Sequence, residues 1–172
     1  MIPRIRKVLY TTDLSKNSAY AFRYAINTAR QHNAKIHILH VIEALPPTAE
    51  TFLLLNLGKK KVAQTRQGLQ EELRKKIEER IAKFAEIELK DEPETLKRIV
   101  GIHVVYGDPV SEILSKTDEL GCDTIIMGTH GKGTVTHTFL GSVAEKVLRR
   151  IRKPVYIIPL PKGDIDISFK EI

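Results

Sequence analysis

The sequence predicts an α/β fold in which five parallel strands form one doubly wound sheet within a single domain. Five short runs rich in Ile and Val are apolar on both faces, as strands of a sheet covered on both sides are. Segments with helical spacing of apolar residues separate these runs, so strands and helices alternate. The length of 172 residues suits one domain with one hydrophobic core. The strand-forming runs are Lys7–Tyr10, Ala34–Ile42, Ile99–Tyr106, Asp123–Met127 and Pro154–Pro159.

The first predicted strand leads directly into a predicted helix. The segment Asp13–Ser18 supplies polar side chains that cap helices, and both Asp13 and Ser15 are candidates for the capping role. Apolar residues then recur at spacings of three and four, which is the spacing of one helix face. These residues are Ala21, Phe22, Ala25, Ile26 and Ala29.

The stretch Ala44–Arg98, between the second and third predicted strands, is too long for a simple crossover. Its second half predicts one long amphipathic helix, because apolar residues share one face and charged pairs share the other. The apolar residues are Leu69, Leu73, Ile77, Ile81, Phe84 and Ile87, and the pairs are Glu71 with Lys75 and Glu72 with Lys76. The preceding apolar run Thr51–Leu57 is expected to pack down, cover a cleft or meet another subunit, and its residues do not choose among these.

The second half of the chain repeats the alternation of strand and helix. A short helix follows the third strand, and Ser142–Ile151 forms the last helix. We therefore predict one domain over residues 1–160, with a helical insertion at about 44–98. Residues 161–172 are expected to form a C-terminal tail that is loose from Ser168 onward.

Composition and charge argue against several classes of protein. No apolar run approaches the roughly 20 residues that span a bilayer, so we expect no membrane partner. The first ten residues lack the apolar centre of a secretory signal, which predicts a cytoplasmic protein. The single Cys122 suits that compartment and is expected to be a packing residue. The net charge of +7 comes largely from basic runs beside helices, so a nucleic-acid partner is not expected.

Four of the ten glycines stand in one short segment that follows the fourth predicted strand. In open parallel sheets, ligands bind beyond the carboxyl ends of the strands. Gly128, Gly131 and Gly133 let main-chain amides approach a ligand closely, and such loops form anion sites. The helix that begins after Gly141 offers unpaired amides and the positive end of its dipole. The segment therefore predicts a phosphate-binding pocket.

Spacing excludes two well-known phosphate motifs. A P-loop has lysine after its second glycine, whereas Thr134 follows Gly133 here. The dinucleotide-binding fingerprint needs a glycine where Thr136 stands, and it follows the first strand of its domain instead of the fourth.

The glycines do match the pattern G-x2-G-x9-G-S, formed by Gly128, Gly131, Gly141 and Ser142. With this motif the chain resembles the nucleotide-binding branch of the universal stress protein family. Other segments are similar to the same family, namely Val8–Ser15, Gly107–Pro109, Asp123–His130 and Ala144–Pro159. The resemblance covers the chain except the insertion and the tail, and it implies a Rossmann-like fold of the adenine nucleotide alpha hydrolase type.

The resemblance implies an ATP site between the first and fourth strands. Thr11 and Asp13 would border the adenosine, and the main chain of Val41 would hydrogen-bond the adenine. Met127 and Gly128 would lie near the ribose. The residues around the phosphates would be Thr129, His130, Gly131, Lys132, Gly133, Gly141, Ser142 and Val143. A Mg²⁺ or Mn²⁺ ion would bridge phosphate oxygens, with few protein ligands.

Some of these roles have alternatives. His130 and Lys132 either neutralise phosphate charge or point into solvent. Asp13 either borders the ligand or caps the first helix. Thr11 stands where related sequences often carry proline, so the turn after the first strand is expected to be less rigid.

The predicted function is a nucleotide-dependent regulatory switch with at most slow ATP hydrolysis, and the resemblance implies a role in the stress response. The sequence shows no base beside the phosphate loop, and phosphoryl transfer needs an oriented nucleophile. The resemblance also implies a homodimer joined through the last strand, whose apolar residues suit an interface. Two alternatives stay open: a genuine ATPase or nucleotidyl-transfer enzyme, and a nucleotide-free dimeric interaction module.

Overall fold

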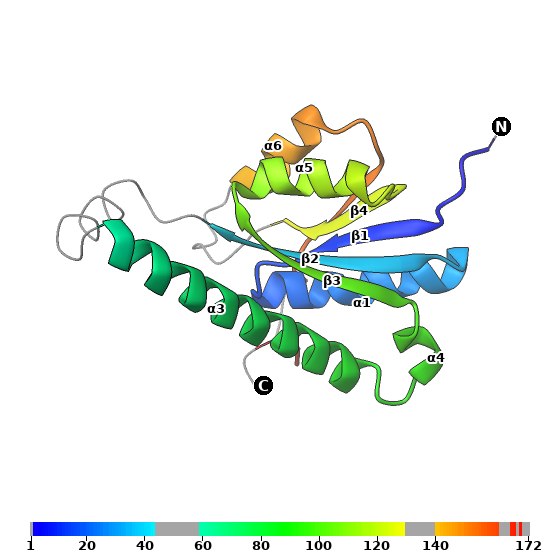
Figure 1. Cartoon of the computed structure of the whole chain (residues 1–172). Coiled ribbons are helices and arrows are strands. Elements are labelled where there is room, and N and C mark those ends of the chain that lie inside the picture. Colours follow the sequence, from blue (N-terminus) through cyan, green and yellow to red (C-terminus); the bar gives the residue numbers. More distant parts are fainter. Residues whose placement is uncertain (1, 44–58, 130–139, 162–165, 168, 170–172) are drawn as a thin grey trace.

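The structure, a computed structural model, describes residues 2–43, 59–129, 140–161, 166–167 and 169, with the backbone alone for 59–66. Strands and helices alternate along the chain, as Figure 1 shows. In chain order the elements are β1 (Lys7–Thr11), α1 (Lys16–His32), β2 (Lys35–Glu43), α3 (Lys59–Glu88), α4 (Pro93–Leu96), β3 (Ile99–Gly107), α5 (Pro109–Glu119), β4 (Thr124–Gly128), α6 (Ser142–Arg150) and β5 (Val155–Ile158). All five predicted strands are present, and no end shifts by more than one residue.

The strands form one parallel sheet in the order β3-β2-β1-β4-β5. Val8 of β1 lies opposite Ile36 of β2 on one side and Thr124 of β4 on the other. The chain adds β2 and β3 on one side of β1 and then crosses to the other side for β4 and β5. The predicted doubly wound α/β fold is confirmed, and the winding reverses between β1 and β4.

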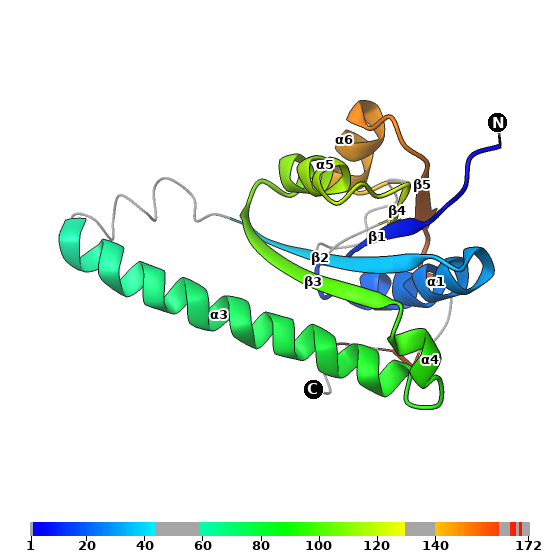
Figure 2. The ribbon, with the colours of Figure 1, turned by 45° about the vertical axis from the view of Figure 1, so that its right-hand side comes forward.

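Helices cover both faces of the sheet (Figure 1, Figure 2). α1 and α3 lie against one face, and α5 and α6 lie against the other. Phe22, Ile38 and Phe84 are buried in the cluster on the first face, and Leu39 and Val147 in the cluster on the second. β2 contributes to both clusters because successive side chains of a strand point to opposite faces.

The hydrogen bonds at the start of α1 show which of the two candidates, Asp13 or Ser15, caps the helix. Ser15 is the cap, because its hydroxyl accepts the amide N–H of Ser18 at 3.2 Å. Asp13 instead accepts the amide of Ser15 with its Oδ1 at 3.1 Å. The helix ends at Asn33, whose left-handed backbone (φ 51°) closes the C-terminus.

α3 is the 30-residue helix that the periodicity of the insertion predicts. Its C-terminal half is packed, since Ile81, Phe84 and Ala85 are buried. Its N-terminal half runs beyond the carboxyl ends of the strands in Figure 1, and there Leu69 is 60% and Leu73 45% exposed. Within the described ranges, no helix is long and apolar enough to cross a membrane.

The C-terminal residues differ from the expected loose tail. Ile167 and Phe169 are buried in the cluster under α1 and α3. The ring of Phe169 lies against that of Phe84, with 4.0 Å between ring centroids. The expectation of a loose end from Ser168 onward is therefore wrong at Phe169, because this ring fills the space between the two helices.

Cys122 is fully buried beside α5 and α6. Burial raises the pKa of its thiol to about 11, so the thiol stays protonated at neutral pH. A protonated, buried thiol is a poor nucleophile. The predicted packing role of Cys122 is confirmed.

β2 and β3 bring together a pair of histidines. His37 Nδ1 lies 3.1 Å from His103 Nε2, and Gly101 stands opposite His37 in the register. A Cβ on Gly101 would come within 2.8 Å of His103 Nε2, so the glycine leaves room for the pair. Partial burial lowers the pKa of both rings, and the neighbouring charge of His103 lowers that of His37 further.

We expect this pair to make the protein less stable in mild acid. The pKa of each ring is lower in the folded protein than in the unfolded chain, so the unfolded chain binds protons more readily. The two neutral rings therefore add stability at pH values above about 6.5, the pKa of histidine in the unfolded chain. This stability is lost as the pH falls from about 6.5 through the lower pKa values that the rings have in the folded protein. Urea unfolding at about pH 7.5 and about pH 5.5 should show a lower free energy of unfolding in acid. A His37→Gln variant should lose less between the two pH values; an equal loss would contradict the assignment.

Candidate functional site

A cleft of about 840 Å³ opens at the carboxyl ends of the strands, where β1 and β4 diverge. The ends of β1, β2 and β4, the starts of α5 and α6, and one side of α3 line it. All predicted site residues in the described ranges are among the lining residues: Thr11, Asp13, Val41, Met127, Gly128, Thr129, Gly141, Ser142 and Val143. The other four, His130, Gly131, Lys132 and Gly133, lie outside the described residues.

The turn after β1 is held in an unusual conformation. Thr12 donates its amide to the carbonyl of Leu39 at 2.9 Å, and its hydroxyl accepts the amide of Leu14 at 3.0 Å. Leu14 has a φ of 64°, a left-handed value that costs a residue with a branched side chain free energy. The strain is held by these bonds at the lip of the cleft, beside Asp13.

The end of β2 presents an unpaired peptide group to the cleft. Peptide groups along a strand turn alternately to its two neighbours, and the carbonyl of Leu39 accepts a bond from the β1 side. Val41, two residues further, turns its N–H and C=O to the same side. The pairing of β1 with β2 stops at Thr11 and Leu39, so within the described part of the chain no backbone group meets those of Val41.

His40 ties β2 to the turn after β1. It is 5% exposed and lines the cleft, and its Nδ1 lies 2.8 Å from the carbonyl oxygen of Thr12. An imidazole N–H at this position donates a hydrogen bond to the carbonyl of Thr12, which lies beyond the end of the sheet pairing. The sequence marks His40 only as a strand residue, because the bond depends on the path of a turn 28 residues away.

Asn17 joins β4 and β5 to the start of α1. Its side-chain amide donates to the carbonyl of Ile158 at 3.1 Å, and its Oδ1 accepts the hydroxyl of Thr129 at 3.2 Å. A Cβ on Gly128 would lie 2.7 Å from Asn17 Oδ1. Gly128 is therefore required by packing against Asn17, in addition to any contact with a ligand. The sequence does not reveal this role of Asn17, because Asn17 stands among several polar residues of a helix-capping segment.

The start of α6 faces the cleft with amide groups. Gly141 precedes the helix and has no side chain to cap it. Its own amide donates to the carbonyl oxygen of Thr129 at 2.6 Å, so this amide is already paired. The amides of Ser142 and Val143 meet no acceptor among the described residues. They stand at the positive end of the helix dipole, where anions are stabilised.

Comparison with known proteins agrees with this fold. The sequence model of the universal stress protein family matches residues 4–159. The chain belongs to this family. Universal stress protein MJ0577 of Methanocaldococcus jannaschii is 31% identical over 153 residues, which cover 89% of this chain and 94% of that protein. Universal stress protein YxiE of Bacillus subtilis is 29% identical over 155 residues, which cover 88% of this chain and 97% of that protein.

Solved structures of the family share the architecture. The structure of MJ0577 has a TM-score of 0.66 and 25% identity, over 94% of this chain and 100% of that chain. A universal stress protein in complex with cAMP has a TM-score of 0.50 and 22% identity, over 91% of this chain and 98% of that chain.

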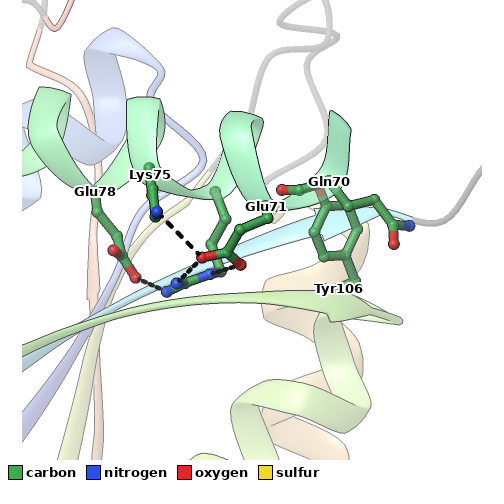
Figure 3. A network of polar contacts seen from close by, with 6 residues as sticks. Gln70, Glu71, Lys75, Glu78 and Tyr106 are labelled. Atoms are coloured by element: carbon green, nitrogen blue, oxygen red, sulfur yellow. Dashed lines mark hydrogen bonds and ion pairs between the residues drawn. The ribbon is translucent and has the colours of Figure 1, made fainter. Parts of the chain in front are cut away.

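In this universal stress protein the insertion supplies one wall of the cleft. Leu73, Ile77 and Arg80 of α3 are lining residues. Figure 3 shows how α3 is attached to the end of β3, where Tyr106 donates its hydroxyl to the carbonyl of Gln70 at 3.0 Å. The periodicity of the insertion predicts this apolar face but not what it covers.

Few carboxylates line the described part of the cleft. Asp13 and Glu43 are the carboxylates among the described lining residues. The described residues contain no group of three or more His, Cys, Asp or Glu side chains that could hold a metal ion. A Mg²⁺ or Mn²⁺ ion here would complete its shell with phosphate oxygens and water, as Mg²⁺ commonly does.

We expect Gly128→Ala to destabilise the protein by about 1–3 kcal/mol, because the new methyl group overlaps the amide of Asn17. Urea unfolding measures the change. Gly68→Ala is the matched control, since nothing lies within 4 Å of a Cβ there. In the middle of α3 that change should stabilise by about 0.5–1 kcal/mol. A Gly128→Ala variant as stable as the wild type would show that Asn17 is not constrained by β4.

Proposed function

We propose that this universal stress protein binds ATP in the cleft and acts as a nucleotide-dependent regulatory switch with at most slow hydrolysis. One observation carries the proposal. The same cleft has an unpaired peptide group at the end of β2 and an uncapped helix N-terminus at the start of α6. The N–H and C=O of an unpaired peptide group can hydrogen-bond the edge of a base, and the amides at a helix N-terminus can bind phosphate.

At the base end, Val41 would donate to and accept from the adenine. Thr11 and Asp13 would border the adenosine, and Met127 and Gly128 would lie along the ribose. This orientation is supported by the sheet order, because β2 and β4 flank β1 on opposite sides. A nucleotide lying across the end of β1 would therefore reach from Val41 to the start of α6.

At the phosphate end, the amides of Ser142 and Val143 would bind the anion together with Thr129. The segment His130–Gly133 would complete the phosphate site by the roles that the family resemblance implies. A bridging Mg²⁺ or Mn²⁺ ion would neutralise charge between phosphate oxygens when bound. The protein's part is to orient the phosphates with main-chain groups.

We expect slow hydrolysis, and the contact made by Asp13 is consistent with this expectation. Efficient attack on a phosphate needs a base that orients water. The Oδ1 atom of Asp13 accepts the amide of Ser15, which fixes this carboxylate at the turn after β1. Contacts that hold ATP equally in the ground state and the transition state do not speed its hydrolysis.

Calorimetry on Ser142→Pro tests the phosphate end. Proline at the first position of a helix keeps the helix and removes one N–H. Gly141, with φ −68° and ψ 153°, already has the backbone that precedes proline. We expect ATP affinity to fall about tenfold or more, as for loss of a hydrogen bond to a charged group. Ser142→Ala, which keeps the amide, should lose less.

Equal affinity in the wild type and Ser142→Pro would contradict phosphate binding at α6, and a wild type that takes up no ATP would end the proposal. ADP, AMP and cAMP belong in the same titrations, because a protein of the same fold is described in complex with cAMP. Turnover of ATP above about one per second would indicate an enzyme instead of a switch.

The proposal includes a homodimer joined through β5. In the described part of the chain, β5 lies at the edge of the sheet and pairs with β4 alone. Tyr156 on this strand is 42% exposed and Leu160 beyond it 38%. An apolar edge strand favours association with a second strand.

We expect Tyr156→Lys to shift the protein from dimer to monomer, because a buried lysine at the interface would lack a partner. Sedimentation velocity measures the shift. Tyr24→Lys is the matched control, since Tyr24 is 44% exposed on α1. A wild type that sediments as a monomer, or two variants with the same effect, would rule out the β5 interface.

A further inference from the structure

The position of α3 at the cleft needs an explanation, because none of the side chains from Leu73 to Arg80, the stretch that reaches the cleft, is buried. Leu73 lines the cleft and is still 45% exposed. Among the described side chains of α3, from Gln67 onward, the first buried residue is Ile81, in the C-terminal half of the helix. Two polar contacts stand near the cleft: the bond from Tyr106 to Gln70 O, and a bond made by Arg80.

Arg80 joins the cleft wall to the C-terminal residues. Its Nε and Nη2 both donate to the carbonyl oxygen of Phe169, at 2.9 Å and 2.6 Å. In the described part of the chain, no carboxylate lies within ion-pair distance of Arg80. The guanidinium is therefore held by a neutral acceptor, and its orientation depends on where the carbonyl of Phe169 is fixed.

Aromatic rings fix Phe169. Its ring packs on Phe84 of α3, which meets Phe22 of α1 at 5.2 Å between centroids. Phe22 in turn lies 5.4 Å from Tyr10 of β1. The Tyr10 hydroxyl donates to the carbonyl of Ser18, itself a lining residue of the cleft. Ring contacts thus connect the C-terminal residues to two walls of the same cleft.

We propose that Phe169 is a latch that holds α3 against the cleft through Arg80, so that nucleotide affinity depends on the C-terminal residues. This inference rests on the proposed ATP site. Arg80 is a positioning residue in this arrangement, and Leu73 and Ile77 are the residues that it positions.

The side of the cleft that α3 covers is the side of the base. α3 packs beside β3, which neighbours β2, and Val41 is at the end of β2. Leu73 and Ile77 would therefore cover the apolar face of an adenine bound at Val41. Such burial contributes to affinity in proportion to the apolar area removed from water. When α3 moves away, this contribution is lost while the phosphate contacts remain.

The arrangement makes Phe169 a point of regulation. A partner that captured Phe169 would release Arg80, loosen α3 and lower ATP affinity. By linkage, bound ATP would oppose the capture of Phe169 to the same extent. The insertion and the C-terminal residues would then act as one element that reports the nucleotide state.

Phe169→Ala tests the latch, because Phe169 is not among the residues that line the cleft. We expect ATP affinity to fall about tenfold, within the usual range of coupling between sites. Ile26→Ala is the matched control, since Ile26 is buried in the same cluster and does not line the cleft. It should lower stability and leave ATP affinity within about twofold.

Hydrogen exchange at residues 73–80 separates positioning from direct contact. We expect faster exchange there in Arg80→Met than in the wild type, together with weaker ATP binding. Arg74→Met is the control, because Arg74 bonds Glu71 and Glu78 on the same helix and does not line the cleft. It should leave ATP affinity unchanged.

Three results would overturn the latch. The first is full ATP affinity in both Phe169→Ala and Arg80→Met. The second is weaker binding in Arg80→Met without faster exchange, which would indicate direct contact of Arg80 with the ligand. The third is a loss of affinity in Ile26→Ala as large as in Phe169→Ala. A wild type that binds no ATP would instead contradict the proposed function, and the two failures are thereby distinguished.

Discussion

The site depends on the hydrogen bonds of peptide groups at the carboxyl ends of the strands. These ends lie where the chain, after adding strands on one side of β1, crosses to the other side. β1 stops at Thr11 while β2 continues to Glu43, so the peptide of Val41 projects past its neighbour. A main-chain polar group without a partner costs free energy unless water or a ligand reaches it. The uncapped start of α6 has the same need. Both sets of groups open onto one cleft, so the sheet topology itself produces a place where a polar, anionic ligand is stabilised.

Buried side chains keep those peptide groups aimed at the cleft. His40 satisfies the carbonyl of Thr12 as β1 turns away, and Asn17 bridges the hydroxyl of Thr129 and the carbonyl of Ile158. These bonds link buried polar atoms of neighbouring elements, so they favour one path for each turn. Preorganisation of this kind lowers the ordering cost of binding.

The strands and the motif residues were predictable from sequence because their signals are local. Apolar runs mark strands, and glycine spacing marks the loop after β4, as the match of the family to residues 4–159 bears out for the fold. Three features were not predictable. Phe169 carries no periodic signal, the contact of His37 with His103 depends on strand register, and the role of Asn17 requires α1 and β5 to meet. Each joins residues distant in sequence through a single bond or ring contact, and such contacts leave no pattern in one sequence.

One wall of the cleft is formed by α3, which is packed at one end only. A helix packed along its whole length opens only when a large part of the core opens, whereas a helix packed at one end responds to single contacts near its free end. α3 is of the second kind, with Ile81 buried and Leu69 exposed. We therefore expect the part of α3 before Ile81 to move at a lower cost in free energy than global unfolding, so that single contacts such as the Arg80–Phe169 bond affect its position. A weakly packed helix held by a few polar contacts, here from Tyr106 to Gln70 and from Arg80 to Phe169, is a suitable element for a switch, because a modest difference in binding free energy is enough to shift its position.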